Sequence, residues 1–310
     1  MTRIFFLLPI GSLLFCNTPA KAEQLILCGW DEVFILDLAQ AEKGKIEKLW
    51  SWRGADRKEL PESLRNAFRT TDDCKPVDGG RKILISSSSG GCALVQRPSG
   101  RVLWYALVPN AHSLELLPQN RVIAASSLSP TGNRLMLYDL ARPDQVLWDG
   151  PLPSAHGVVW DADRQVLWAL GLKELRCYER KDWPTDKPSL AMKASYPLPD
   201  DDGHDLQAVP GTKDLVVTTG RHVYLFDRGE LRFRLHPALA DMAMVKCVSI
   251  HPVSRRTAFV QASGKEWWND TIGLLSPPGQ LTLPGQRLYK VRWLPEQAGE
   301  ESGGLRNIAR

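Results

Sequence analysis

The sequence predicts an all-β protein, a six-bladed β-propeller with four-stranded blades. The first observation is a short apolar run followed by small polar residues that occurs six times at nearly even intervals: LILCG at residue 25, ILISSSS at 83, VIAASS at 122, VLWALG at 166, LVVTTG at 215 and TAFVQAS at 257. The second is that each run is followed by another β-rich run that ends in a polar turn. The third is the repeat length of about 48 residues, the size of a four-stranded unit with its loops.

Antiparallel strands account for the pattern within each repeat. Apolar and polar residues alternate along the runs, and β-branched and aromatic residues are frequent. A sheet of four strands buries both of its faces only between similar neighbours, so six units close into a ring around a central channel. Two segments, PESLRNAF near residue 61 and ALADMAM near residue 238, have helical patterns and fall in connections between repeats.

The two ends of the chain predict how the ring closes. After residue 22 the chain begins directly on a second-strand run, LILCG, while the C-terminal run LYKVRWLPE has the form of an innermost strand. We therefore expect residues 288–295 to complete the blade that begins at residue 24. The propeller domain then spans residues 23–296, and residues 297–310 form a flexible tail.

The first 22 residues have the pattern of a secretory signal peptide. A short basic start, MTR, precedes the apolar run IFFLLPIGSLLF and the small residues Ala20 and Ala22. This run is shorter than the roughly 20 residues of a membrane span, which favours cleavage after Ala22 over an uncleaved anchor. A lipoprotein site at Cys16 is disfavoured by the large Phe15 before it. We expect export to the periplasm or the cell exterior, with no membrane span.

Charge, motifs and cysteines exclude several classes of function. The 39 Lys and Arg residues only slightly exceed the 35 Asp and Glu residues, which argues against a nucleic-acid partner. No phosphate-binding glycine motif is present, so no nucleotide or organic cofactor is expected, and we expect a monomer. The five cysteines after residue 22 leave at least one thiol unpaired. Four lie in apolar runs typical of small buried residues, so we expect no chemistry from Cys28, Cys74, Cys92, Cys177 and Cys247.

The starts of the innermost strands predict a ring of polar side chains at one mouth of the channel. Alignment of these strands by the turns that end them places Pro118, Pro210, Pro252 and Pro295 in one register. Because innermost strands start at the same end of a propeller channel, side chains six positions earlier should meet there. This register contains one polar residue per blade: Asp73, His112, His156, His204, Lys246 and Tyr289.

The three histidines of this ring predict a metal site. Imidazoles from three consecutive blades beside the Asp73 carboxylate suit a divalent ion such as Mn²⁺, Fe²⁺, Zn²⁺ or Ni²⁺, which the sequence does not distinguish. Asp205, next to His204, and Glu115, three residues after His112, are candidates for orienting the imidazoles. In the alternative interpretation, the ring only hydrogen-bonds water and its own members at a wet channel mouth.

Further residues predict contacts with a substrate. Lys75 lies two positions after Asp73 and, with Lys246, places cations beside the proposed ion, so an anionic substrate is expected. Lys75 and Glu115 are predicted substrate-binding residues. Trp267 and Trp268 form an aromatic pair on which a sugar would stack. The alternative role of this pair is packing between blades, which is the commoner role of tryptophan in a propeller.

Several motifs carry a resemblance to a family of uncharacterised secreted bacterial proteins: TDDCKPVDGG, SSSGGCALV, NAHSLELLP, SAHGVVWD, LWALG, GHDL and EWWND. The resemblance covers nearly the whole chain after the signal and implies a six-bladed β-propeller, but no activity. A looser likeness is to oligogalacturonate lyases, larger propellers whose central metal is held by histidines and a glutamine. It rests on the architecture and the histidine-rich centre, and no stretch aligns motif by motif.

The leading functional hypothesis is an exported, metal-dependent, carbohydrate-active enzyme that performs a lyase-like β-elimination on an anionic sugar. The ion, held by the three ring histidines and Asp73, would act with Lys75 to stabilise the enolate formed when a proton beside a carboxylate is removed. Lys246 or Tyr289 would be the catalytic base. The rival hypothesis is a non-catalytic propeller that binds a saccharide, a peptide or a partner protein at the same mouth, and a third is a structural scaffold.

Overall fold

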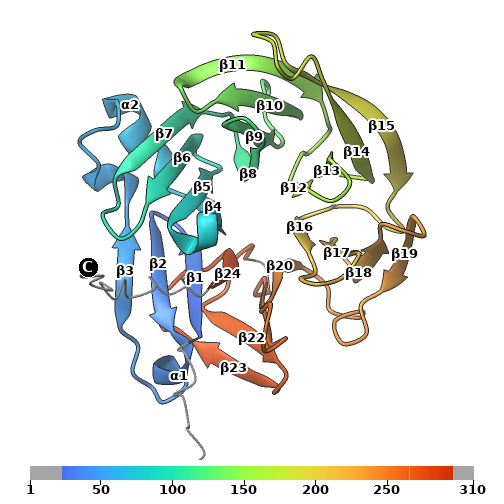
Figure 1. The fold of residues 1–310 in the computed structure, drawn as a ribbon. Helices are drawn as coiled ribbons and strands as arrows, with labels where there is room; N and C mark the ends of the chain where they lie inside the picture. The colour runs from blue at the N-terminus through green and yellow to red at the C-terminus, as the bar shows by residue number, and fades with distance from the viewer. Residues whose placement is uncertain (1–22, 265, 296–310) are drawn as a thin grey trace, which may run out of the picture.

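Six four-stranded antiparallel sheets surround a central channel in the computed structural model (Figure 1), which describes residues 23–295 except residue 265. This confirms the predicted six-bladed propeller. The predicted signal peptide (1–22) and tail (297–310) lie outside the described residues. Among the residues described, no helix is long and apolar enough to cross a membrane.

We label the six blades A to F. In blades B to F the strands follow the chain order outward from the channel, whereas in blade A the C-terminal strand β24 precedes β1 to β3. Blades A to C contain β24 (Lys290–Leu294), β1 (Gln24–Gly29), β2 (Glu32–Asp37) and β3 (Lys48–Trp52); β4 (Thr71–Val77), β5 (Lys82–Ser87), β6 (Gly91–Gln96) and β7 (Val102–Leu107); and β8 (Ala111–Leu117), β9 (Arg121–Ser126), β10 (Arg134–Asp139) and β11 (Arg142–Pro151). Blades D to F contain β12 (Gly157–Asp161), β13 (Val166–Leu170), β14 (Glu174–Lys181) and β15 (Ser189–Pro197); β16 (Asp205–Ala208), β17 (Asp214–Thr218), β18 (Val223–Asp227) and β19 (Arg232–Leu235); and β20 (Val245–Ile250), β21 (Thr257–Gln261), β22 (Thr271–Leu275) and β23 (Gly279–Thr282).

Blade A closes the ring as predicted, because its innermost strand comes from the C-terminal end of the propeller. β24 pairs antiparallel with β1 in the register Gln24↔Leu294 to Cys28↔Lys290. The backbone amide of Tyr289 also donates to the carbonyl of Cys28 at 2.9 Å. Strands from the two ends of the described chain therefore lie side by side in one sheet (Figure 1).

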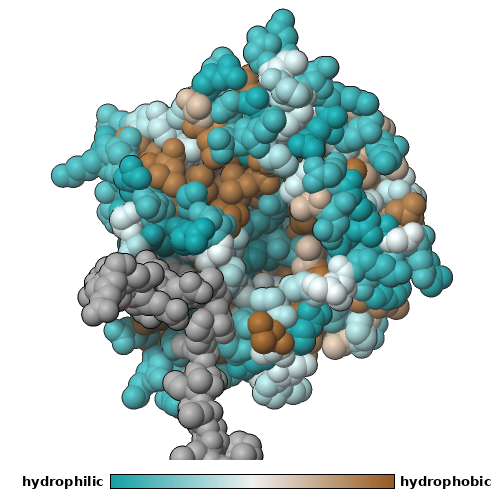
Figure 2. Space-filling model, viewed as in Figure 1, coloured by the Kyte–Doolittle hydropathy of each residue, from teal (hydrophilic) through white to brown (hydrophobic). Residues whose placement is uncertain are grey.

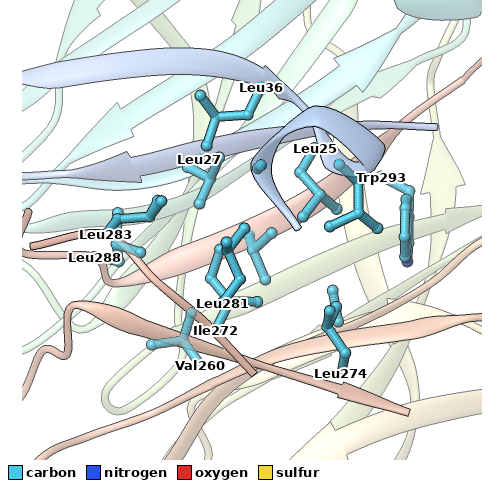
Figure 3. Packing of buried hydrophobic residues seen from close by; sticks show 14 of the residues in the cluster. Leu25, Leu27, Leu36, Val260, Ile272, Leu274, Leu281, Leu283, Leu288 and Trp293 are labelled. Carbon is cyan, nitrogen blue, oxygen red and sulfur yellow. The ribbon is translucent and has the colours of Figure 1, made fainter. Parts of the chain in front are cut away.

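The hydrophobic core lies between adjacent blades. On β1, Leu25 and Leu27 pack toward blade F, where the cluster in Figure 3 includes Val260, Ile272 and Leu274. The alternate residues Ile26 and Cys28 pack toward blade B. Because both faces of the sheet are buried, β1 is apolar from Leu25 to Cys28 rather than alternating with polar residues.

Short helical segments lie in the connections. The segment predicted near residue 61 is confirmed as α2 (Glu62–Arg65) followed by the 3-10 turn η2 (Asn66–Phe68). The helix predicted near residue 238 is wrong, because residues 237–241 form turns. There the Nδ1 atom of His236 accepts hydrogen bonds from the amides of Ala238 and Leu239, which replaces helical bonding locally. The remaining short segments are α1 (Leu38–Ala41), η1 (Gly54–Asp56) and η3 (Asp78–Gly80).

The centre of the ring is polar. In the space-filling view, hydrophilic side chains line the hollow at the centre of the visible face, and a hydrophobic patch lies to one side of it (Figure 2). Because the innermost strands supply the side chains at this centre, the channel is where polar groups from all six blades meet.

Candidate functional site

One side chain from each blade meets at one mouth of the channel, which we call the histidine mouth. Its six residues are Asp72, His112, His156, His204, Lys246 and Tyr289. They line a cavity of about 320 Å³ together with Ser88, Asn110, Ser127, Leu128, Ser154, Asp202 and Trp267. The predicted convergence of His112, His156, His204, Lys246 and Tyr289 is therefore confirmed.

β-Bulges at the starts of three innermost strands place part of this ring. On β4, Thr71 pairs with Ser87 and Asp73 pairs with Ser86, so Asp72 is the extra residue without a partner. His112 on β8 and Lys246 on β20 are the extra residues of equivalent bulges. A bulge turns its extra residue away from the regular pleat, and here that turn directs the three side chains into the mouth.

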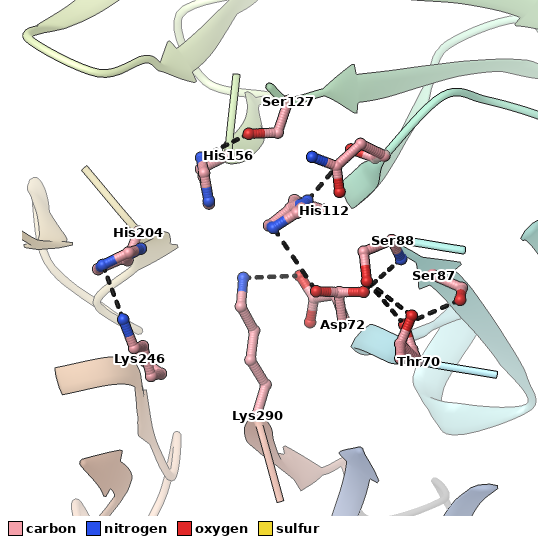
Figure 4. Close-up of polar contacts among 12 residues, drawn as sticks. Thr70, Asp72, Ser87, Ser88, His112, Ser127, His156, His204, Lys246 and Lys290 are labelled. Carbon is pink, nitrogen blue, oxygen red and sulfur yellow. Dashed lines mark hydrogen bonds and ion pairs between the residues drawn. The ribbon is translucent and has the colours of Figure 1, made fainter. Parts of the chain in front are cut away.

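The three imidazoles lie next to one another around the mouth (Figure 4). The ring centroids of His112 and His156 are 4.2 Å apart, and those of His156 and His204 are 5.4 Å apart. The Nδ1 atom of His112 lies 3.1 Å from the carbonyl oxygen of Asn110, and that of His156 lies 2.9 Å from the carbonyl oxygen of Ser154. A carbonyl only accepts, so these contacts favour the tautomer in which both Nδ1 atoms carry the proton and both Nε2 atoms keep a lone pair. The hydroxyl groups of Ser154 and Ser127 also lie 3.1 and 3.2 Å from Nδ1 of His156 and can accept that proton.

Burial keeps the imidazoles neutral. It lowers the pKa of His112 to about 3 and the pKa of His156 well below its usual value, with smaller contributions from neighbouring imidazoles and cations. The pKa of His204 is also lowered, mainly by burial, although Asp202 opposes the shift. Neutral imidazoles with free lone pairs are able to ligate a metal ion. Within the described residues, no group of three or more His, Cys, Asp or Glu side chains already has the arrangement that holds an ion.

Asp72 is the carboxyl group of the ring. Its Oδ1 atom lies 3.6 Å from Nε2 of His112, and its Oδ2 atom accepts a hydrogen bond from the backbone amide of Ser88. Burial raises the pKa of Asp72 to about 7, although the hydrogen bonds from Ser88 oppose this shift. Near neutral pH the Asp72 carboxyl group therefore exists partly in its protonated form, and at 3.6 Å it lies beyond hydrogen-bond distance of His112.

Lys246 completes the other side of the ring. Its Nζ atom lies 2.9 Å from Nε2 of His204. This Nε2 atom of His204 also lies 3.2 Å from Oδ2 of Asp202. Burial lowers the pKa of Lys246 to about 8, an effect that nearby Lys290 increases and Asp202 opposes. The Nδ1 atom of His204 is buried and has no hydrogen-bond partner in the described structure.

The prediction that Asp73 belongs to the ring is wrong by one residue. Because Asp72 is the bulge residue, the side chain of Asp73 points deeper into the channel, where its Oδ1 atom accepts from Nε of Arg292 at 3.0 Å. Asp205 is also occupied there, bonding both Nη atoms of Arg292 at 2.9 and 2.6 Å. Asp205 therefore does not orient His204 as expected, and Asp202 contacts that imidazole instead.

A cluster of four buried charges, which we call the charged plug, fills the channel below the histidine mouth. It consists of Asp73, Asp205, Lys290 and Arg292, each at most 2% exposed. Lys290 adds a 3.0 Å contact to Asp205 and a 3.8 Å contact to Asp73. Burial alone would raise the pKa of both carboxyl groups, but Arg292 and Lys290 overcome it and lower both. The plug consists of two ion pairs, so its formal charges cancel.

The predicted substrate contacts Lys75 and Glu115 do not lie at the histidine mouth. They line a separate cavity of about 260 Å³, together with Gln207, Ser249 and Arg292. The Nζ atom of Lys75 donates to the carbonyl of Val158 at 2.5 Å and lies 3.3 Å from Oε2 of Glu115. Lys75 and Glu115 are absent from the histidine mouth because they lie further along the innermost strands β4 and β8 than the mouth residues do. Glu115 therefore does not orient His112.

The two predicted aromatic contacts have different positions. Trp267 lines the cavity of the histidine mouth and is 38% exposed. One face of its ring stacks on Trp30 with centroids 5.3 Å apart, and its ring lies edge-on to Tyr289 at 5.4 Å. Trp268 instead packs edge-on against Trp30 and beneath the guanidinium group of Arg287. The structure thus favours the packing role for Trp268, and leaves Trp267 at the cavity.

Sequence alignment by turns missed Asp72 and Asp202, and did not identify Lys290 and Arg292 as members of a plug. The bulge of β4 has no sequence signal that separates Asp72 from Asp73. The alternation of Lys290 and Arg292 within the apolar run YKVRW was a usable signal, because two cations in a buried innermost strand require buried anions.

The fold and the mouth define the class of protein as a six-bladed β-propeller with a histidine-rich cavity at one end of a plugged channel. A comparison with protein families then places the chain. Residues 30–299 match the family of unknown function DUF6528, and the chain belongs to this family. A comparison with curated proteins found no match.

Proposed function

We propose that the protein is an exported, metal-dependent enzyme that acts on an anionic saccharide at the histidine mouth. The observation that carries the proposal is the orientation of His112 and His156. Each Nδ1 atom lies against a backbone carbonyl, and each Nε2 lone pair is left for a ligand. Imidazoles of metal sites are held in this way, because the outer hydrogen bond fixes the tautomer and the direction of the ligating nitrogen.

The donor set of the mouth fits a divalent ion of the first transition series. Three imidazoles and the carboxyl group of Asp72 are the ligand types that Mn²⁺, Fe²⁺, Zn²⁺ and Ni²⁺ accept. The buried Nδ1 atom of His204 has no hydrogen-bond partner in the described structure, so the polar contacts of the mouth residues are incomplete. Ligation by His204 through Nε2 requires both Lys246 and Asp202 to leave that atom, which frees the amine of Lys246 for another role.

The freed amine of Lys246 is the proposed base. With a pKa of about 8, a substantial fraction of Lys246 is neutral in mildly alkaline solution and accepts a proton from the carbon beside the substrate carboxylate. A bound ion would stabilise the resulting enolate charge on the carboxylate. The electron pair then forms a carbon–carbon double bond as the β C–O bond breaks. Tyr289, whose pKa burial raises well above its usual value, stays protonated and donates its proton to the leaving oxygen.

Trp267 is the proposed binding surface for the sugar ring. Its partial exposure at the cavity lets the apolar C–H groups of a sugar pack on it, while Trp30 and Tyr289 hold the indole in place. Lys75 has no part in this proposal, because it lies at the separate cavity.

Metal analysis tests the first step of the proposal. Elemental analysis of protein purified without chelator should find one transition-metal ion per chain, and calorimetric titration of the metal-free protein with Mn²⁺, Zn²⁺ or Ni²⁺ should show saturable binding. His156→Ala should weaken this binding at least about tenfold. His222→Ala, which changes a histidine outside the mouth, is the matched control. An ion-free protein whose melting temperature is unchanged by all three ions would contradict the proposal.

A lyase assay tests the second step. Incubation with a panel of anionic polysaccharides should produce the ultraviolet absorbance of an unsaturated sugar. Lys246→Met should abolish the product while metal binding persists, and Tyr289→Phe should slow its formation. Equal rates in Lys246→Met and the unchanged protein would exclude Lys246 as the base.

One observation favours the second candidate function, non-catalytic recognition at the same mouth. Lys246, His204 and Asp202 already contact one another, which suits a preformed recognition surface. In that case saccharide or peptide binding persists with no turnover, and His156→Ala weakens binding without exposing a pH-dependent step.

A further inference from the structure

Two buried cysteines share one interface between blades. Cys28 on β1 of blade A and Cys74 on β4 of blade B are both completely buried. They belong to the same hydrophobic cluster, with Ile26, Val33 and Ile83. Both are free thiols in the structure, and Cys74 is, after burial, the next contributor that raises the pKa of the Cys28 thiol.

The backbone brings the two cysteines together. The amide of Gly29, next to Cys28, donates to Oγ1 of Thr71 at 2.9 Å, and the amide of Thr71 donates to the carbonyl of Trp30 at 2.6 Å. These bonds tie the end of β1 to the start of β4. Cys28 packs away from blade F, and Cys74 follows a residue that faces the channel, so both side chains enter the space between blades A and B.

The other described cysteines lie at different interfaces. Cys92 belongs to the cluster between blades B and C, Cys177 to the cluster between blades D and E, and Cys247 to the cluster between blades F and A. Side chains in separate clusters cannot meet without opening the propeller. Cys28 and Cys74 are thus the pair that the fold selects among the described cysteines.

We propose that Cys28 and Cys74 form a disulfide that links blade A, the closing blade, to blade B. The two thiols exchange with a disulfide oxidant, either a small-molecule disulfide or the active-site disulfide of an oxidoreductase. The Cys28–Cys74 bond forms, the bond of the oxidant breaks, and the oxidant leaves as two thiols that carry both protons and both electrons. The inference shares with the proposed function only export to a compartment that permits disulfides, and it uses neither the metal nor the catalysis.

Burial decides when this reaction occurs. Neither thiol is exposed in the folded protein, and burial raises the pKa of Cys28, so the reactive thiolate is scarce and out of reach of an oxidant. The disulfide therefore forms during folding, before blades A and B pack, and afterwards resists reductant in the native state.

The test uses the full chain refolded from denaturant in a mixture of oxidised and reduced glutathione. After denaturation and alkylation, peptide mapping by mass spectrometry should find one linked peptide pair, containing Cys28 and Cys74, and alkylated Cys92, Cys177 and Cys247. The folded reduced protein, exposed to the same mixture without denaturant, should remain fully reduced. Complete alkylation of Cys28 and Cys74 after oxidative refolding, or a pair containing another cysteine, would overturn the proposal.

Matched variants separate the disulfide from a general effect of changing a buried thiol. Cys74→Ala should leave no linked pair, whereas Cys177→Ala, which changes a buried thiol at another interface, should keep the Cys28–Cys74 pair. Reduction in denaturant followed by refolding without oxidant should lower the melting temperature of the unchanged protein and of Cys177→Ala, but not that of Cys74→Ala. If any variant does not fold, the peptide map of the unchanged protein decides the question alone.

Discussion

Replacement of Arg292 tests whether the charged plug stabilises the closed ring. Arg292 lies on β24, the strand that closes blade A, and bonds Asp73 on blade B and Asp205 on blade E. Arg292→Met keeps most of the side-chain volume but leaves Lys290 as the single cation of the plug beside two buried carboxylates. Removal of one partner from a buried ion pair costs about 3–5 kcal/mol, and we expect a loss of that size in the free energy of unfolding at pH 7.

The pH dependence of this loss is the sharper part of the prediction. In the unchanged protein the pKa values of Asp73 and Asp205 are lowered, so their stabilising contribution is present above the unfolded value of about 4 and falls only as the pH drops through the lowered folded values. Arg292 is the cation that most lowers both pKa values, so both rise when it is removed, and the variant binds protons at a higher pH than the unchanged protein. The difference between the two proteins should therefore shrink from pH 7 to pH 5.

Urea denaturation followed by tryptophan fluorescence and circular dichroism measures both effects. The control is Arg134→Met, which removes an exposed ion pair with Asp149 and should cost about 0.5 kcal/mol or less. A loss below about 1 kcal/mol for Arg292→Met, or a loss that grows as the pH falls from 7 to 5, would refute this account of the plug.

Three further substitutions have expected outcomes. Gly29→Ala places a Cβ atom 1.9 Å from the carbonyl oxygen of Arg287. The free energy of unfolding should therefore fall by about 2 kcal/mol or more in a chemical denaturation experiment. The control is Gly44→Ala, whose Cβ atom meets no other atom within 4 Å and which should cost less despite the positive φ of Gly44. Trp52→Ala empties a fully buried site between blades A and B and should cost about 3–5 kcal/mol by the same measurement. Trp267→Ala should reduce saccharide binding at the histidine mouth at least about fivefold in calorimetry; unchanged affinity would exclude Trp267 as the binding surface.

The architecture follows from the sequence because it depends on local patterns that repeat. Each blade needs only short apolar strands with polar turns between them, and the six-fold repetition of such runs can be recognised without knowing any long-range contact. The closure of the ring by the C-terminal strand was predictable for the same reason. The run containing Val291 and Trp293 has the pattern of an innermost strand, whereas the chain directly after residue 22 starts with the pattern of a second strand.

The histidine ring was predictable only to the accuracy of strand register. Turn alignment placed His112, His156 and His204 correctly, since a propeller repeats the same strand position around its axis. It placed Asp73 where Asp72 lies, because a β-bulge shifts the register by one residue and the sequence Thr-Asp-Asp offers two equivalent carboxyl groups.

Only the tertiary structure shows how far along the channel each polar side chain lies. Lys75 and Glu115 lie only a few residues from ring positions, yet the plug separates them from the histidine mouth. The sequence by itself determined the blades, the closure and the three imidazoles, because these depend on periodicity. The tertiary structure decided which carboxyl group joins the ring, which charges fill the channel and which cysteines share an interface between blades, because each depends on residues from different blades that no local pattern relates.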